Sequence, residues 1–512
     1  MTRTASSAPV LVADAPLTVD DILGVAAGAR LELAKPAIDR ILASRAVVDD
    51  LVGGEQLIYG LNTGLGNLRD QRMPLDTLRE YQDAIVRTHA GGIGPPLPVA
   101  VVRAAMCVRV AGIARGGAGA SLAVAEKLVA MLNLGVHPVV PTIGSVGASD
   151  LMHMAAIGMV AIGRGRAEVG GIVMPGAEAL ALAGIEPVVL EPKDGLALVS
   201  ANGVSIGHGA LVVDRAARAA DNADIVAALS LEAARGNPSI VEPVVASAKP
   251  IAGQLESARR IRALLDGSSL CLAGGPASIQ DPLSFRVLPQ VHGALRELVG
   301  FARKAVDDEL ASIDDNPMVV VEEHRMASNG NFHPILMALA FDALRPGLAH
   351  AGLLSEHRSG HHFDSFATTP EAFADGGVLL AAMVGGATLM RYSAAARSSE
   401  LRGLAEPATL DIPMLDVGVE DHSTNAPLTV RRTDETLDVV DDLLAVELVI
   451  GWMLLRRIEG VEHKLGSGTS PVLQAIDAAL AGLGAEPASE DMHAAVRGVL
   501  ADGTLEAAAS LR

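Results

Sequence analysis

Apolar and polar residues alternate with a helical period along much of the chain, most clearly beyond the first two hundred residues. Apolar side chains recur at three- and four-residue spacing over residues 206–235, 284–312 and 434–458. That spacing predicts helices with one apolar face, and long helices joined by short connections predict an elongated bundle. We therefore expect a central bundle of long helices over residues 203–470, followed by shorter helices over 471–512.

Gly and Pro divide the first 202 residues into shorter segments. Helical patches at 101–114 and 122–134 lie between loops rich in these two residues, and short strands are expected near 167–173. Gly and Pro interrupt regular structure, and ordered loops on a rigid scaffold commonly carry chemistry. The pattern predicts a mainly α-helical protein in which residues 1–202 form an N-terminal domain that carries the functional loops.

Composition supports helices and narrows the class of protein. Half of the 512 residues are hydrophobic but only 2% are aromatic, so we expect a core of close-packed aliphatic side chains. A net charge of −20 argues against nucleic-acid binding, because an acidic surface repels phosphates. The only cysteines are Cys107 and Cys271, too few for a disulfide framework or a thiolate metal site.

The sequence shows no pattern typical of export or membrane insertion. Residues 1–16 lack the basic stretch and long apolar run of a signal peptide. No run of about 18 uncharged apolar residues occurs. The nearest, 443–455, contains Glu447 and is flanked by charged residues. These observations predict a cytoplasmic protein without a membrane partner.

Two loops near the N-terminus contain residues suited to proton transfer. Tyr59 begins the Gly-rich loop 59–66, where its hydroxyl could face a ligand and a perturbed phenol could act as a general base. His89 stands before a second Gly-rich loop, and the pKa of a histidine suits proton transfer. The alternatives are a turn in which Tyr59 only packs and a histidine that is only structural.

Two later motifs also combine polar and ionisable groups. Ser149 and Asp150 end the loop 144–150, and this pair after glycine is typical of a helix N-cap. We expect the two side chains to cap a helix over 151–162. Arg286 could bind a carboxylate with both arms of its guanidinium, or could pair with an acidic neighbour.

Glu420-Asp421-His422 places three ionisable groups side by side. Three adjacent side chains cannot converge on one ion, so no metal site is expected. Each of these motifs is a weak signal when taken alone. Their order and spacing along the chain carry more information.

In this order, the motifs resemble the histidine and aromatic amino acid ammonia-lyase family, and the match extends over nearly the whole chain. The matching segments are 59–66, 89–94, 144–149, 192–198, 280–282, 315–317, 330–333, 399–400 and 420–422. The resemblance implies a mainly α-helical subunit and a homotetramer in which several subunits build each active site. It also implies a small amino-acid substrate.

In that family an Ala-Ser-Gly tripeptide cyclises to a methylidene-imidazolone, an electrophile that captures the substrate and helps to expel its amine. The resemblance makes Tyr59 the acid/base residue and Arg286 the carboxylate anchor. The residues that would line the substrate pocket are His89, Ser200, Asn202, Gln280, Asn331 and Phe332. Glu420 favours histidine or a related imidazole substrate, because histidine-specific members carry Glu-Asp-His and a carboxylate accepts an imidazole N–H.

The chain departs from the family at the ring-forming tripeptide. The family continues Ala-Ser-Gly-Asp, whereas this chain reads Ala148-Ser149-Asp150. Cyclisation needs a tight bend at the third residue, where a Cβ is costly. The missing glycine therefore argues against a methylidene-imidazolone, and no other cofactor is expected.

Further departures affect the pocket. The tyrosine that follows Gln-Asp-Pro in the family is Leu283 here, and the glutamine before Glu-Asp-His is Val419. The pocket asparagine is either replaced by Ser200 or displaced to Asn202. Because several of the family's active-site side chains are absent together, we expect chemistry that differs from that of the family.

Three functions remain open. The first is a lyase resembling histidine ammonia-lyase, which eliminates an amine from histidine or a related aromatic or imidazole amino acid. The second is an elimination or isomerisation without the cyclised electrophile, for example on a betaine. The third is a non-catalytic homologue, against which the retention of Tyr59, His89 and Arg286 argues.

Overall fold

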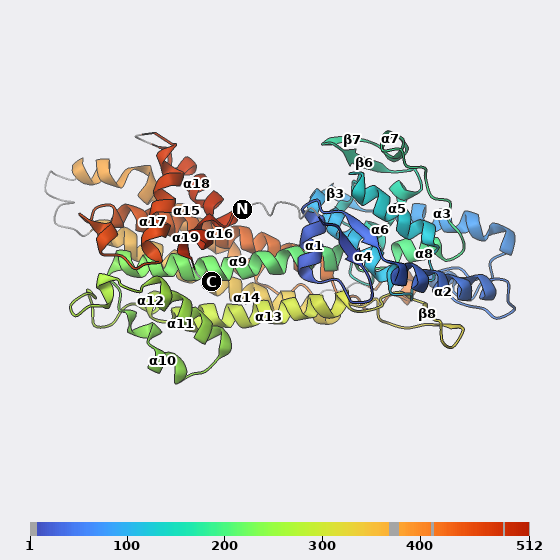
Figure 1. Ribbon diagram of the computed structural model, residues 1–512, viewed down its shortest axis with the longest axis horizontal. Coiled ribbons are helices and arrows are strands. Elements are labelled where there is room, and N and C mark those ends of the chain that lie inside the picture. The colour runs from blue at the N-terminus through green and yellow to red at the C-terminus, as the bar shows by residue number, and fades with distance from the viewer. Residues whose placement is uncertain (1–7, 368–377, 411–413, 485–486, 511–512) are drawn as a thin grey trace.

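Long helices run side by side along most of the molecule, and the N-terminal part lies at one end of them (Figure 1). The computed structural model describes residues 8–367, 378–410, 414–484 and 487–510. Helices dominate these residues, and the strands are few and short. The prediction of a mainly α-helical protein is confirmed.

Helix lengths differ between the two ends of the chain. The N-terminal part contains α1 (Val19–Ala26), α2 (Lys35–Leu51), α3 (Leu78–His89), α4 (Val99–Ala114), α5 (Leu122–Asn133), α6 (Leu151–Ala161), α7 (Gly176–Leu182) and α8 (Asp194–Val199). The long helices are α9 (Gly203–Ala234), α13 (Leu288–Leu310), α14 (Ile335–Ala367), α15 (Val378–Leu404) and α16 (Ala426–Leu455). The others are α10 (Pro243–Ser247), α11 (Ala252–Leu264), α12 (Leu283–Arg286), α17 (Thr469–Ala481), α18 (Ser489–Ala501) and α19 (Thr504–Ala509).

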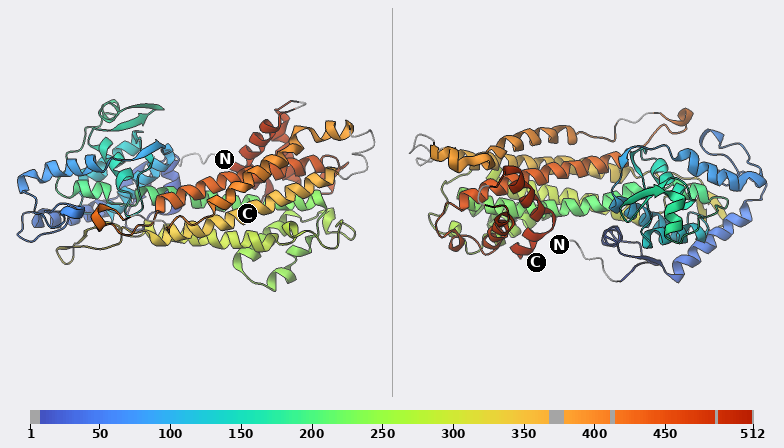
Figure 2. Two further views of the ribbon diagram at one scale, coloured as in Figure 1. Left: turned by 180° about the vertical axis from the view of Figure 1, so that it is seen from behind. Right: turned by 90° about the horizontal axis from the view of Figure 1, so that it is seen from above.

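The core of the bundle consists of α9, α13, α14 and α16, which pack against one another, with α15 along α14 and α16 (Figure 2). Aliphatic side chains fill this core. The helices approach closely where residues are small: a Cβ on Gly207 of α9 would lie 2.8 Å from the Ala104 carbonyl carbon of α4. Helices that approach this closely leave little space between them for aromatic side chains, which agrees with the low aromatic content of the chain.

One helical stretch, Asp194–Ala234, has the length and hydropathy of a membrane span, and 94% of its apolar window is buried inside the protein. It includes α9, the central helix of the bundle. This stretch, and not residues 443–455, comes nearest to the length and hydropathy of a membrane span. Its burial is that of a core helix.

Short strands brace the N-terminal part and one loop beside it. β1 (Val10–Val12) pairs with β2 (Leu31–Leu33), and β3 (Ile93–Pro96) pairs with β5 (Pro141–Ile143). β4 (His137–Pro138), β6 (Arg166–Val169) and β7 (Ile172–Pro175) form one antiparallel sheet, and β8 (Met318–Val320) pairs with β9 (Arg325–Ala327). The strands predicted near 167–173 are confirmed as β6 and β7.

Two predictions about helices need correction. The helix predicted over 284–312 is broken at Val287, which ends α12 and precedes α13. Pro289 lies in the first turn of α13, a position that tolerates proline because its missing N–H would have no partner there. The long helices α14 and α15 were not predicted. α14 packs against α9, α13, α15 and α16, so its apolar residues do not form one stripe.

α9 connects the two ends of the molecule. Its 32 residues span roughly 48 Å at about 1.5 Å per residue. Asn202 precedes it in the N-terminal part. Its other end contacts the segment before α12, where the Ala277 N–H donates to the Arg235 carbonyl at 2.8 Å. Residues beside the two ends of α9 are therefore far apart within one chain.

Candidate active site

Tyr59 lies in a tight loop that packs on α8. Gly60 and Gly66 have φ angles of 64° and 55°, and a Cβ on Gly60 would lie 2.4 Å from Cδ2 of Leu196. Glycine adopts such a backbone without strain and fits this close approach. The loop closes on itself, and the Gly66 N–H donates to the Tyr59 hydroxyl at 3.4 Å.

Tyr59, His89 and Glu420 belong to one electrostatic cluster. Burial raises the pKa of Tyr59, the Gly66 hydrogen bond opposes this, and the charge of Glu420 raises it further. Burial also raises the pKa of Glu420, and the nearby His89 opposes that shift. The His89 Nδ1 donates to the Ile85 carbonyl at 2.7 Å.

Asp416 is a member of this cluster that the sequence did not indicate. Its charge raises the pKa of both Tyr59 and Glu420. A Cβ on Gly66 would lie 2.1 Å from Oδ2 of Asp416, so the last glycine of the Tyr59 loop gives room to this carboxylate. The Leu415 N–H donates to the Glu420 carbonyl at 2.8 Å, which closes the loop that carries both acids.

The loop 144–150 is held from two sides. Gly147 has a φ of 81°, and a Cβ there would lie 2.2 Å from the Thr424 hydroxyl, which donates to the Gly147 carbonyl at 2.8 Å. The Ser149 N–H donates to the Phe332 carbonyl at 3.2 Å. Ser149 adopts a φ of 59°, uncommon for a residue with a Cβ. The half-buried Ala148 and the buried Ser149 thus lie beside the backbone of Phe332.

Asp150 does not cap the helix that follows it, contrary to the sequence-based prediction. It occupies the N-cap position of α6, but neither its side chain nor that of Ser149 makes a capping hydrogen bond there. The Asp150 carboxylate instead accepts from the Ser205 N–H at 2.7 Å, the Ser205 hydroxyl at 2.8 Å and the Ser145 hydroxyl at 3.2 Å. Burial raises the pKa of Asp150, whereas the charge of His153 and these hydrogen bonds lower it. Ser205 donates two hydrogen bonds to the Asp150 carboxylate, whereas capping α6 would provide only backbone N–H donors of that helix.

Ser200 and Asn202 both lie next to this loop. The hydroxyls of Ser149 and Ser200 are 3.4 Å apart. The Asp150 N–H donates to the Ala201 carbonyl at 2.8 Å. The Asn202 side chain is fully buried, and within the described ranges neither its oxygen nor its nitrogen has a hydrogen-bond partner.

The backbone of Asn202 contacts a cluster of acidic residues, Asp314, Asp315 and Glu309. The Asn202 N–H donates to Asp314 at 2.8 Å. Burial, and then the neighbouring Asp315, raise the pKa of Asp314 to about 6, while Arg109 opposes the shift. Glu309 and Asp314 line one small cavity, and burial raises the pKa of Glu309 to about 7. The backbone at Asn202 therefore depends on a titratable carboxyl.

The turn around Phe332 adds a histidine pair to this region. Nε2 of His333 and Nδ1 of His422 are 2.9 Å apart. Desolvation and His422 lower the pKa of His333. The side chain of Asn331 is exposed, while its N–H donates to Asn329 at 2.9 Å. The pair joins the Phe332 turn to the loop that carries Glu420.

Gln280 and Arg286 lie at the opposite end of the bundle. Both belong to the segment around α12, which is found at the far end of α9 from the N-terminal part (Figure 1). Gln280 is exposed, and among the described residues the Arg286 guanidinium has no hydrogen-bond or ion-pair partner. One chain thus brings together most of the predicted site residues but not these two.

No group of three or more His, Cys, Asp or Glu side chains among the described residues could hold a metal ion. The possible metal ligands near Glu420 are its own carboxylate, that of Asp416, and the imidazoles of His333 and His422, which already contact each other. What the cluster offers is a phenol, imidazoles and carboxylates for binding and proton transfer.

Comparison with known proteins gives consistent matches over nearly the full length. Residues 17–478 match the family model described as aromatic amino acid lyase. Histidine ammonia-lyase of Gloeobacter violaceus is 36% identical over 497 residues, covering 96% of this chain and 95% of that protein.

Two solved structures are similar to this one at a TM-score of 0.88. Ergothionase from Treponema denticola, an ergothioneine-degrading enzyme in complex with desmethyl-ergothioneine sulfonic acid, is 25% identical and covers 97% of this chain and 99% of its own. Tyrosine aminomutase from Streptomyces globisporus is 27% identical and covers 98% of each chain.

Proposed function

The chain belongs to the aromatic amino acid lyase family and is a carbon–nitrogen lyase of the ammonia-lyase type, and from this premise we propose that it eliminates an amine from histidine or a related imidazole amino acid. The observation that carries the proposal is the cluster of Tyr59, His89 and Glu420. A phenol for proton transfer lies there beside a carboxylate that can accept an imidazole N–H. The near full-length match to a histidine ammonia-lyase supports the same substrate class.

Tyr59 serves as the base in this proposal. Its phenolate takes the β-proton, the C–H electrons form the new double bond, and the C–N electrons leave with the amine. Burial and the neighbouring carboxylates raise the pKa of Tyr59, so the phenolate is scarce at neutral pH but is a strong base once formed. The rate should therefore rise as the pH increases into the alkaline range.

The residues at 148–150 do not fit a methylidene-imidazolone, and we propose that they remain a linear peptide. Ring closure requires the amide nitrogen of Asp150 to bond to the carbonyl carbon of Ala148. That N–H donates to the Ala201 carbonyl at 2.8 Å, and three hydrogen bonds hold the Asp150 side chain. The Ser149 hydroxyl, which ring formation would remove, stays next to Ser200.

A ring-free site favours substrates whose amine leaves readily. A quaternary ammonium group departs as a neutral tertiary amine and cannot lose its charge beforehand, so a betaine of histidine is the second candidate substrate. Similarity to an ergothioneine-degrading enzyme supports this candidate. Isomerisation is the corresponding alternative, supported by similarity to an aminomutase.

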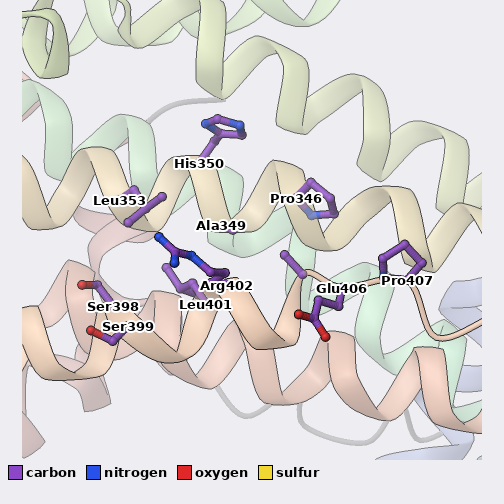
Figure 3. A pocket seen from close by; sticks show the side chains of 11 residues that line it. Pro346, Ala349, His350, Leu353, Ser398, Ser399, Leu401, Arg402, Glu406 and Pro407 are labelled. Atoms are coloured by element: carbon purple, nitrogen blue, oxygen red, sulfur yellow. The ribbon is translucent and has the colours of Figure 1, made fainter.

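Completion of the site requires a second copy of the chain, and we propose a homotetramer. α9 spans roughly 48 Å and separates Asn202 from the segment around α12 that carries Gln280 and Arg286, so in this proposal another subunit supplies the carboxylate anchor. α14 and α15 also present apolar side chains to solvent, including Tyr392, which is 69% exposed. A groove of about 710 Å³ lies between these helices, and Leu353, Leu401 and Arg402 are among the residues that line it (Figure 3). A neighbouring subunit would bury these surfaces.

Turnover of a small substrate panel tests the function. The purified protein is incubated with L-histidine, with its trimethylated betaine and with L-phenylalanine. Near-ultraviolet absorbance follows the unsaturated acid, and mass spectrometry identifies the released amine. Elimination from histidine or its betaine but not from phenylalanine is expected. No turnover of any of the three by the tetramer would support a non-catalytic homologue.

A further inference from the structure

The N-terminus of α9 is capped by a residue from another part of the chain. Asn202 is the N-cap residue, and asparagine is among the best capping residues, but its side chain makes no capping hydrogen bond. The N–H that it would bind, that of Ser205 in the first turn, donates to Asp150 at 2.7 Å. Asp150 therefore occupies the position at α9 that Asn202 would otherwise fill.

The surroundings of Asp150 are built for this contact. Its carboxylate is fully buried, accepts three hydrogen bonds from Ser205 and Ser145, and lies at the positive end of a 32-residue helix. It provides no hydrogen bond to α6, the helix that it precedes. The side chain thus stabilises α9 and ties the loop 144–150 to it.

Capping by Asp150 leaves the amide of Asn202 without a partner. Both polar atoms of this buried side chain lack a hydrogen bond within the described ranges. Buried polar groups in proteins nearly always have partners, so an amide of this kind indicates a bound ligand or water. It lies two residues after Ser200, whose hydroxyl is 3.4 Å from that of Ser149 in the candidate site.

We propose that Asp150 is a positioning residue that caps α9 in place of Asn202, so that the Asn202 amide is free to bind the substrate. The inference rests on the proposed function for the identity of that substrate. It identifies Asn202 as the displaced pocket asparagine, with Ser200 beside it.

A double-mutant cycle tests whether Asp150 acts through Asn202. Asp150→Ala and Asn202→Ala should each lower kcat/KM roughly 10- to 100-fold, because one hydrogen-bonded contact to the substrate is lost. If Asp150 acts through Asn202, adding Asp150→Ala to Asn202→Ala should change kcat/KM by less than about threefold. Full additivity of the two losses would overturn the proposal. Ser145→Ala, which removes one bond to Asp150 but leaves the cap of α9, is the matched control.

The crystal structure of Asp150→Ala provides a readout that does not depend on activity. The Asn202 side chain is expected to turn and accept the Ser205 N–H, as an ordinary N-cap does. An unmoved Asn202 would overturn the proposal. If Asp150→Ala does not fold, Asp150→Asn serves in the double-mutant cycle, because its single carbonyl oxygen can still accept from Ser205 and should give a smaller loss of kcat/KM that the Asn202→Ala background abolishes.

The two proposals fail separately. Absence of turnover and of histidine binding by the wild-type tetramer would refute the proposed function, and the exchange of the cap in the Asp150→Ala crystal would still decide the role of Asp150. Normal wild-type turnover with additive losses in the cycle would refute only the role of Asp150.

Discussion

Recovery of activity from two inactive variants would show whether the active site is shared between subunits. Tyr59 lies in a loop that packs on α8, the helix just before α9, and Arg286 belongs to α12, which lies near the other end of α9 (Figure 1). The 32 residues of α9 separate these ends by roughly 48 Å, far beyond the reach of any side chain. Under the proposed function, a working site therefore takes Tyr59 from one chain and Arg286 from another.

The expected recovery follows from this separation. Tyr59→Phe removes the base and should lower kcat roughly 10²- to 10⁴-fold. Arg286→Ala removes the carboxylate anchor and should weaken substrate binding by roughly 2–5 kcal/mol. When the two variants are co-expressed equally, half of the positions that supply Tyr59 and half of those that supply Arg286 are intact. About a quarter of the sites in the mixed assemblies should then be active.

The assay compares purified mixed assemblies with each parent variant at equal concentration. A matched control combines Tyr59→Phe with Glu420→Gln, because both residues lie in the same cluster of one chain. Every site in this control carries one of the two substitutions, so its rate should not exceed the mean of its parents. Absence of recovery in the Tyr59 and Arg286 pair, or equal recovery in both pairs, would refute the shared site.

Three other predictions follow from the geometry of single groups. The proteolytic peptide that contains residues 148–150 should have its unmodified mass, because the Asp150 N–H is bound to Ala201, and a loss of two waters would contradict this. Glu420→Gln should raise KM for imidazole substrates roughly 10- to 100-fold, because a neutral amide replaces the charged acceptor of the ring N–H; an unchanged KM in steady-state kinetics would remove Glu420 from ring recognition. The pKa of Asp314 is raised to about 6, so the folded chain binds this proton more tightly than the unfolded chain. Its contribution to the free energy of unfolding should therefore fall by about 3 kcal/mol as the pH rises from about 4 to about 6, and stay level above. Urea unfolding of Asp314→Asn should lack that step, and an unchanged pH dependence would contradict the assignment.

Periodicity predicted several helices of the bundle and of the N-terminal part. Residues 206–235 and 434–458 fall within or largely within α9 and α16, and the patch at 101–114 falls within α4. It did not predict α14, which neighbouring helices contact on several sides and which contains Pro346. The proline reads as a helix breaker in the sequence.

The candidate residues could be named from their motifs, but their arrangement could not. Glycines at 60 and 66 indicated a loop around Tyr59, and the structure gives each a positive φ. Asp416 gave no signal, because it stands in an irregular loop and affects Tyr59 only through space. The position of Arg286 at the other end of α9 also depends on how the long helices are connected, which local spacing does not report.

Two segments in which the chain departs from the family pattern contact each other in the structure. One segment reads Ala148-Ser149-Asp150 without the family's glycine, and the other, before Gly203, has Ser200 and Asn202 as alternatives for the family's pocket asparagine. The segment before Gly203 supplies the Ala201 carbonyl that binds the Asp150 N–H, and α9, which follows it, supplies the Ser205 donors. Insertion of a glycine after Ser149 would correct only one side of this contact. The Ala201 carbonyl and the α9 cap would still compete for Asp150, so the chemistry of this loop is set jointly by both segments.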